Sequence, residues 1–540
     1  MIDRRDRLFW LVIVGMAIGL TVYRYADAAL LYPNLGDDAW AYLHSQKQLI
    51  FPMIFGAPGP RPLYFILVHL LSPHYFNPGF LPDSFPLWSY GFIPEMRYAI
   101  FSMGAVVFWI IPVAGFVAWR LTQSRVAGVI VAALMAFSPY QNLIATTLQP
   151  HVVQMLPLMF IYYRVWCVDP KAENIREKWQ AGLLTGLLCS IAVMLNYHNW
   201  FFVGPMGPVL MACLFVNGVR RFPDPLVRSM VRSVREIAPY GAAMLISLMA
   251  PLVVIDIVFR VNEASGGIIF KSSVGTFPYF TAAFALPFEL SASIGTHFDF
   301  SLSEKISGFK EVLLDQFGIY GLILILVSVF WGLYCVIKGV RDAPSFSIIG
   351  TLIVSYMLIH ASFVPPYGRL TMPLEFPAYV LIAKLVVDAA AGKGRWKLLS
   401  WPVFAGLLMM YSHMAFSSGV ILEDMLGSGR AAKWLTENSQ GSNLYYASGN
   451  YAGGPSLTPL SAQELGPDAS GYLLAVTETD KDWVSILEGI TPVRSWRTNG
   501  TGLKSFHVIG SLPYEDDYYF DHFVVYDLGE VIKAINDTSS

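Results

Sequence analysis

Apolar residues recur along this chain in runs long enough to cross a membrane, separated by polar segments rich in arginine and lysine. A helix needs about 20 apolar residues to span a bilayer, and only helices and closed barrels satisfy their backbone hydrogen bonds there. The pattern therefore predicts a polytopic α-helical membrane protein with about eleven transmembrane helices. We place them near residues 8–24, 98–119, 126–145, 152–168, 179–197, 200–218, 238–258, 317–337, 345–363, 371–390 and 398–418.

Basic residues divide unevenly between alternate loops. If the N-terminus lies in the cytosol, the inside loops hold eighteen Lys and Arg, whereas the longer outer loops before residue 419 hold nine. Such an excess marks the cytoplasmic side. Within a transmembrane domain of residues 1–418, this predicts long outer loops at 25–97 and 259–316. The apolar stretch "RPLYFILVHLLS" in the first loop is short for a span, and we interpret it as a half-embedded or interfacial helix, with a full extra span as the alternative.

The composition changes after residue 418. Residues 419–540 hold seven Lys and Arg but sixteen Asp and Glu. Their segments "NLYYAS", "GYLLAVTE", "SFHVIG" and "HFVVYDLG" are typical of strands, and "AAKWLTEN" and "DKDWVSILEG" are typical of short helices. We therefore expect a small acidic α/β domain over 419–540, outside the cytoplasm.

The overall composition excludes an ordinary soluble protein. The chain is 55% hydrophobic and 14% charged, against about 25% charged residues in soluble domains. All four cysteines lie inside apolar runs, so neither a disulfide framework nor a cysteine metal site is expected. We predict a multi-pass protein of a bacterial cytoplasmic (inner) membrane whose partners include the lipid bilayer and no nucleic acid.

Two adjacent acids follow the first predicted helix. Asp37 and Asp38 come directly after Pro-Asn-Leu-Gly, at what should be the outer membrane surface. One acid suffices to cap the following "AWAYLHSQ" helix. Two adjacent acids repel each other, and a second interpretation makes them a general base, metal ligands or acceptors for a sugar hydroxyl. The residues alone leave both interpretations open.

The order of these segments resembles the GT-C superfamily of membrane glycosyltransferases, which use polyprenyl-phosphate-linked sugars. "DDAWAY" is similar to the Asp-Glu-x-x-Tyr opening of the branch that contains protein O-mannosyltransferases and lipid A aminoarabinose transferases. "RPLYFILVHLL" resembles the Lys-Pro-Pro-Leu-Tyr segment of that branch, with one proline replaced. The segment from "EMRYAIF" to "LMAFSP" resembles its second and third helices, and "YGRLTMPLEFPAYVLIAKLV" resembles a late helix. The likeness covers roughly residues 1–390 in layout.

The resemblance implies an inverting transfer of a sugar from a polyprenyl-phosphate donor to a glycan, lipid or protein acceptor at the outer membrane face. Carried over, Asp37 is the base that deprotonates the acceptor hydroxyl, and Asp38 orients the acceptor or binds a divalent cation. The departing lipid phosphate needs cationic partners, and the candidates are Arg369, Arg61 and Arg97. A snorkelling interfacial side chain is the alternative for Arg369.

Three histidines are further candidates for lining the site. His44 follows Asp37 by seven residues and falls on roughly the same helix face. His151 and His198 lie at predicted outer helix ends, where a plain hydrogen-bonded role is the alternative. Asp38, His151 and His198 are candidate metal ligands. The cofactor stays unassigned, with a divalent cation as one option.

Two other function classes compete with this prediction. A transporter or flippase of a lipid-linked or small polar solute needs ionisable residues deep in its helices. Here the candidates are few and lie near helix ends: Arg164, Asp256 and Lys384. A glycan polymerase or ligase of another fold would depend on outer Arg and His residues and not on an acid pair, so Asp37→Asn separates it from the leading hypothesis.

Overall fold

The computed structural model describes a little more than half of the chain, chiefly its helices and strands. The described residues are 4–28, 62–70, 103–138, 141, 150–166, 174–196, 199–200, 202–204, 215, 225–264, 302–337, 348–350, 352–353, 355, 371–392, 400–413, 434, 438, 443–447, 458–460, 470–476, 486–487, 489–497 and 522–539.

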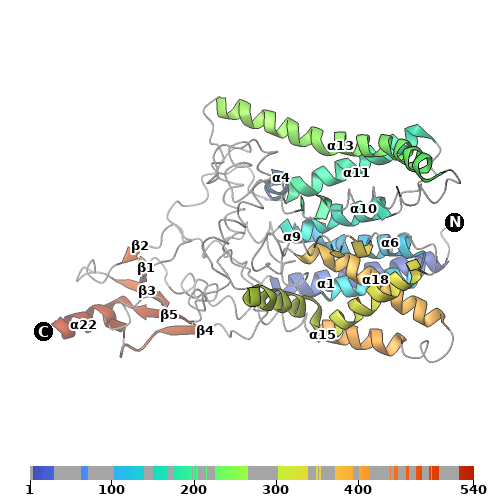
Figure 1. Ribbon diagram of the computed structural model, residues 1–540. Helices are drawn as coiled ribbons and strands as arrows, with labels where there is room; N and C mark the ends of the chain where they lie inside the picture. The colour runs from blue at the N-terminus through green and yellow to red at the C-terminus, as the bar shows by residue number, and fades with distance from the viewer. Residues whose placement is uncertain are drawn as a thin grey trace.

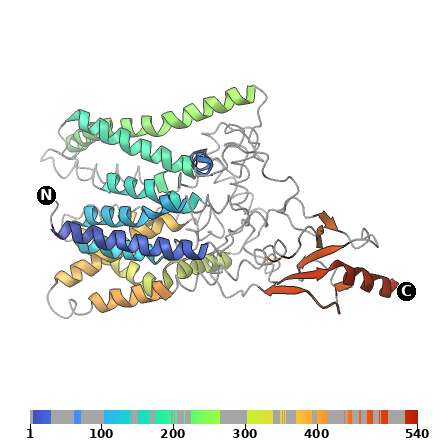
Figure 2. The same ribbon diagram turned by 180° about the vertical axis from the view of Figure 1, so that it is seen from behind.

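The helices lie side by side in a bundle, and a small β-sheet lies beyond one end of it (Figure 1). The N-terminus lies at the opposite end, as the view from behind also shows (Figure 2). The helices are α1 (Arg4–Ala28), α4 (Pro62–Leu70), α6 (Ile110–Thr122), α7 (Arg125–Ala136), α9 (Pro150–Val153), α10 (Met155–Trp166), α11 (Ile175–Leu195), α13 (Leu226–Ala264), α15 (Leu302–Ile337), the 3₁₀ turn η4 (Met372–Leu374), α18 (Glu375–Ala391) and α22 (Leu528–Ser539).

Five helical segments in the described part of the chain are long and apolar enough to cross a membrane. They are Arg4–Tyr23, Met103–Thr122, Ile175–Leu195, Leu226–Val254 and Gln316–Tyr334. Each overlaps a span predicted from the sequence, which supports the prediction of a polytopic helical protein. The predicted total of eleven spans includes segments, such as most of 200–218, that lie outside the described residues.

The short apolar stretch of the first predicted outer loop is a helix, as expected. Helix α4 has nine residues, a length of about 14 Å at 1.5 Å per residue, which is too short to cross a bilayer. Its Tyr64 and Val68 are fully buried, and the helix contacts α11. The helix expected in this stretch is therefore confirmed, and its half-embedded position stays a prediction.

Glycines let neighbouring helices approach closely. A Cβ added at Gly128 of α7 would lie 2.5 Å from the carbonyl oxygen of Gly115 in α6. On α11, Gly182 and Gly186 lie against the backbone of α13, and a Cβ at Gly186 would collide with the Met244 carbonyl. This spacing of small residues one turn apart is typical of helix contacts in membranes, where close backbone packing drives association.

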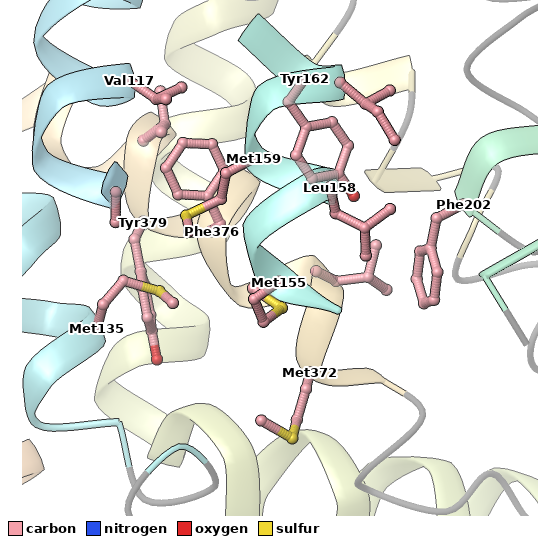
Figure 3. Close-up of a cluster of buried hydrophobic side chains, with 14 of the residues drawn as sticks. Val117, Met135, Met155, Leu158, Met159, Tyr162, Phe202, Met372, Phe376 and Tyr379 are labelled. Carbon is pink, nitrogen blue, oxygen red and sulfur yellow. The ribbon is translucent and has the colours of Figure 1, made fainter. Parts of the chain in front are cut away.

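The centre of the helical core lies between α10 and α18 (Figure 3). The rings of Tyr162 and Phe376 stack with centroids 6.0 Å apart, and Tyr162 Oη donates to the carbonyl oxygen of Pro373 in η4 at 3.3 Å. The thioethers of Met155 and Met372 fill the same region and are fully buried. Helix α10 is thereby held against the start of α18.

The C-terminal part of the chain contains a five-stranded mixed sheet with strand order β2-β1-β3-β5-β4. Strand β1 is parallel to β2 and β3, whereas β5 is antiparallel to β3 and β4. Leu528 and Val531 of α22 pack against Leu473 and Val524 of the sheet. The strands are β1 (Asn443–Ala447), β2 (Thr458–Leu460), β3 (Gly471–Val476), β4 (Arg494–Arg497) and β5 (His522–Asp527).

Three strands predicted from the sequence are confirmed as β1, β3 and β5. The predicted strand "SFHVIG" lies outside the described residues. Strands β2 and β4 and helix α22 were not predicted. Helix α22 begins at Leu528, directly after β5, so no turn residues separate it from the strand pattern.

Candidate functional site

Of the candidate residues named for the glycosyltransferase site, only His151 belongs to the described part of the chain. The others lie outside it: Asp37, Asp38, His44, Arg61, Arg97, His198 and Arg369. Several of them directly adjoin described elements, however. Arg61 immediately precedes α4, His198 precedes Asn199, and Arg369 lies two residues before Thr371. The surroundings of these elements can therefore be examined.

His151 lies in α9, a single turn that begins with Pro150 at its first position. Proline suits that position because its missing N–H would be unpaired there anyway. The imidazole is 2% exposed, and its Nδ1 lies 3.4 Å from Nδ2 of Asn196. Because an amide nitrogen only donates, Nδ1 acts as the acceptor, which leaves the ring proton of the neutral form on Nε2.

A buried polar cluster forms around this histidine. Asn196 Nδ2 also donates to Gln154 Oε1 at 2.8 Å, and Asn199 Nδ2 donates to the Ala192 carbonyl of α11 at 2.6 Å. Gln154, Asn196 and Asn199 are each at most 1% exposed. We name His151, Gln154, Asn196 and Asn199 the His151 cluster. It joins the start of α10 to the end of α11.

The His151 cluster has one incomplete position. The Oδ1 atom of Asn199 is buried and has no hydrogen-bond partner among the described residues. An unpaired buried acceptor is costly, and it is a feature of sites that receive a ligand or water. His198, a candidate from the sequence, is the residue directly before Asn199.

The His151 cluster lies toward the sheet. Helices α9 and α4 both sit at the end of the helical bundle that faces the β-sheet, away from the N-terminus (Figures 1 and 2). In the chain, Arg61 directly precedes α4. The His151 cluster and the helix of the first predicted outer loop therefore lie at one end of the bundle.

A second buried polar cluster was missed by the sequence analysis. Glu375, the first residue of α18, is fully buried and accepts hydrogen bonds from three side chains. They are Ser138 Oγ at 2.8 Å, Gln141 Nε2 at 3.3 Å and Gln316 Nε2 at 3.3 Å. Thr371 Oγ1 donates in turn to Gln316 Oε1 at 2.8 Å. We name these five residues the Glu375 cluster.

The signal for Glu375 was present in the sequence. It is the one acid within "TMPLEFPAYVLIA", residues 371–383, and an acid within a membrane-spanning helix suggests a function by default. Its place at a predicted helix end, where carboxylates favour the helix dipole, concealed it. None of its partners could have been named, because they come from distant parts of the chain.

A divalent cation was one option for the site. Among the described residues, no group of three or more His, Cys, Asp and Glu side chains is placed to hold a metal ion. His151 offers one imidazole beside neutral amides, and the acid of the candidate set, Asp38, lies outside the described residues. The described side chains do not make a metal site.

No protein-family model matches the sequence, and no curated protein matches it. The chain is similar to the solved structure of ArnT from Cupriavidus metallidurans bound to undecaprenyl phosphate, with a TM-score of 0.49 and 10% identity over 96% of this chain and 97% of that one.

Two structures of an archaeal protein are similar as well. The apo oligosaccharyltransferase of Archaeoglobus fulgidus has a TM-score of 0.43 and 13% identity over 80% of this chain, which spans 58% of that protein. AglB from the same organism, in complex with an inhibitory peptide and a dolichol-phosphate, has a TM-score of 0.42 and 11% identity over 90% of this chain and 71% of that one.

Proposed function

We propose that this protein is a membrane glycosyltransferase. It moves one sugar from a polyprenyl-phosphate donor to a glycan, lipid or protein acceptor at the outer face of a bacterial cytoplasmic membrane. The observation that carries the proposal is the acidic pair Asp37-Asp38 together with the "RPLYF" segment that follows it in the sequence. That segment continues into helix α4, whose Tyr64 and Val68 are buried. ArnT and AglB were solved with undecaprenyl phosphate and dolichol-phosphate, which are lipids of the proposed donor class.

The proposed chemistry is a single displacement at the anomeric carbon. Asp37 takes the proton of the acceptor hydroxyl, the acceptor oxygen bonds to the anomeric carbon, and the bond to the phosphate oxygen breaks. The products are an inverted glycoside and polyprenyl phosphate. General-base catalysis of this kind contributes about 10²–10⁴-fold.

Two other groups complete the proposed site. Arg369, Arg61 and Arg97 are the candidates to neutralise the departing phosphate, because guanidinium groups bind phosphate through paired charged hydrogen bonds. The buried amides and imidazole of the His151 cluster suit the hydroxyl groups of a sugar, which both donate and accept. Asn199 Oδ1 supplies an acceptor with no partner among the described residues.

The test is a transfer assay with purified protein in detergent. Radiolabelled polyprenyl-phosphate sugars and an envelope-glycan acceptor are given to wild type, Asp37→Asn and Asp38→Asn. We expect Asp37→Asn to lower transfer by about 10²-fold or more while the protein still binds the donor. Asp38→Asn is the matched control, because it removes the adjacent charge and leaves the proposed base in place, so its loss should be smaller.

Other results would contradict the proposal. Equal transfer by all three proteins would make the acidic pair a helix cap and reject the mechanism. Absence of transfer by the wild type with every donor, together with uptake of a labelled lipid-linked solute into proteoliposomes, would favour the transporter class instead.

A further inference from the structure

The Glu375 cluster joins three chain segments that are far apart in the sequence. Ser138 and Gln141 follow α7, Gln316 lies in α15, and Thr371 and Glu375 begin the η4 and α18 segment. The hydrogen bonds from Glu375 to Ser138 and Gln316 cross 237 and 59 residues of chain. All five side chains are at most 1% exposed, so water does not compete for these bonds.

Each contact in the cluster has a defined direction. The Glu375 carboxyl oxygens accept from Ser138, Gln141 and Gln316, while Ser138 Oγ also accepts from the Gln141 backbone N–H at 3.2 Å. Gln316 makes a reciprocal pair with Thr371, because its Nε2 donates to the Thr371 carbonyl at 3.1 Å and its Oε1 accepts from Thr371 Oγ1. Donors and acceptors therefore alternate through the cluster.

Helix α15 is interrupted next to this cluster. Gly318 has φ 64° and ψ 164°, which are not helical, so residues 302–317 and 319–337 form two helical parts. Glycine adopts this left-handed backbone angle without the steric cost that other residues meet. A break in the hydrogen-bond ladder removes the stiffness that would otherwise hold 302–317 in line with the rest of α15.

Side-chain contacts hold the segment 302–317 at the break. Gln316 binds Thr371 and Glu375, and the ring of Phe317 packs edge-on against Tyr379 of α18 with centroids 6.1 Å apart. The segment forms the last part of the second long outer loop predicted at 259–316, where the structure has helix from Leu302 onward. In the chain, Thr371 follows Arg369 by two residues. The cluster is thus the point where these two parts of the chain meet the end of α7.

We propose that Glu375 is a positioning residue that holds residues 302–317 of α15 and the start of α18 against the segment after α7. Its structural role stands independently of the activity. Its consequence for catalysis rests on the proposed function. Glu375 binds Gln316, which in turn binds Thr371, and Thr371 follows the candidate Arg369 by two residues in the chain, so loss of the cluster lowers the transfer rate.

The structural role is tested by hydrogen–deuterium exchange with mass spectrometry on the full chain in detergent. In Glu375→Gln, one acceptor oxygen becomes a donor NH₂, so at least one of the three donors loses its partner. We expect exchange of peptides within 302–317 to become about tenfold faster, which is the effect of losing one buried hydrogen bond. Peptides within 319–337 should be unchanged.

Ser328→Ala is the matched control. Ser328 is also a buried polar residue of α15, but it lies beyond the break, and its Oγ donates to the Leu324 carbonyl of its own helix. This variant should leave the exchange of 302–317 unchanged. Equal acceleration of all peptides in Glu375→Gln, or no acceleration at all, would overturn the proposal.

A double-mutant cycle provides the decisive test. Gln316→Leu removes the hydrogen bonds of Gln316 to Thr371 and Glu375, and it is combined with Glu375→Gln. If Glu375 holds 302–317 through Gln316, the double variant should exchange no faster in 302–317 than Gln316→Leu alone, whereas two independent losses of stability would multiply. If Glu375→Gln does not fold, Thr371→Val removes one bond of the same cluster and should accelerate exchange of 302–317 by about threefold.

The catalytic consequence has a separate measurement. Glu375→Gln should lower kcat for transfer by about tenfold, and adding it to Gln316→Leu should lower kcat no further. Normal transfer by a variant with accelerated exchange would overturn the positioning role. If the wild type transfers no sugar, the proposed function fails, whereas the exchange experiment still decides what Glu375 holds together.

Discussion

The two buried polar clusters of the helical bundle differ in how completely their polar atoms are hydrogen-bonded. In the Glu375 cluster, each of the five side chains is hydrogen-bonded to another member, around a carboxyl that receives three donors. In the His151 cluster, the side chains are an imidazole and neutral amides, and Asn199 Oδ1 has no partner among the described residues. Both clusters are almost wholly shielded from solvent.

This difference separates two uses of buried polar groups in a membrane protein. In a fully hydrogen-bonded network such as the Glu375 cluster, few buried groups lack a partner, and the network holds distant segments in one arrangement. Its loss should therefore appear mainly as lower stability and greater motion of those segments. An open network keeps an acceptor available, so its loss should appear mainly in binding. Tyr162 of α10 contacts Pro373 and Phe376 and so connects the two clusters. The His151 cluster lies at the start of α10, and the Glu375 cluster lies at the start of α18.

The largest effect is expected from Glu375→Ala. The variant leaves Ser138, Gln141 and Gln316 with buried donors that have lost their acceptor, at about 1–3 kcal/mol for each unpaired group. We expect the free energy of unfolding to fall by about 3 kcal/mol, measured by denaturant unfolding in detergent micelles. Ser328→Ala should change it by less than about 1 kcal/mol. A loss below about 1 kcal/mol in Glu375→Ala would mean that the cluster is not a structural network.

The next effect is expected from Gly186→Ala in α11. Its Cβ would meet the Met244 carbonyl, so α11 must move away from α13 at a cost of about 2 kcal/mol, typical of overpacking. Because Asn196 caps α11, this shift should disturb the His151 cluster and leave exchange of residues 302–317 unchanged. Gly15→Ala is the control, since nothing lies within 4 Å of a Cβ there. Equal stability of the two variants would contradict close packing of α11 on α13.

The smallest change in stability is expected from Asn199→Leu. The variant removes an unpaired oxygen together with one hydrogen bond to Ala192, so the two effects nearly cancel and stability should stay within about 1 kcal/mol. The KM for donor or acceptor should nevertheless rise by about tenfold, because a hydroxyl of the substrate loses its acceptor. Thr185→Val, a buried polar control within α11 bonded to Tyr240, should not alter KM. An unchanged KM in Asn199→Leu would remove Asn199 from the site.

Much of the helical architecture could be predicted because it depends on local properties. The runs that became α1, α11 and α13 are apolar over a membrane's width, and α4 is too short for a span in the sequence as in the structure. The alternating patterns of β1, β3 and β5 were equally readable. Helix α22 was not predicted because it follows β5 directly, so no turn residues mark the change from a strand pattern to a helix pattern.

Less of the candidate site could be predicted from the sequence. His151 could be named because a histidine at a predicted helix end is conspicuous, but its neighbours Gln154 and Asn196 are ordinary polar residues until the chain folds. The interruption of α15 at Gly318 also could not be foreseen. Glycine is tolerated inside membrane helices, and nothing local distinguishes Gly318 from Gly321, which continues the helix three residues later.

The sequence by itself determined that this chain forms apolar helices and a polar C-terminal sheet, because the transfer energy of a side chain and the period of a pattern are properties of neighbouring residues. Only the tertiary structure decided which buried polar groups meet. Ser138 and Gln141 reach Glu375 across more than two hundred residues, and such a pair is selected by the packing of whole helices. A hydrogen bond requires its two atoms to lie within about 3 Å, and that condition is met in space and not along the chain.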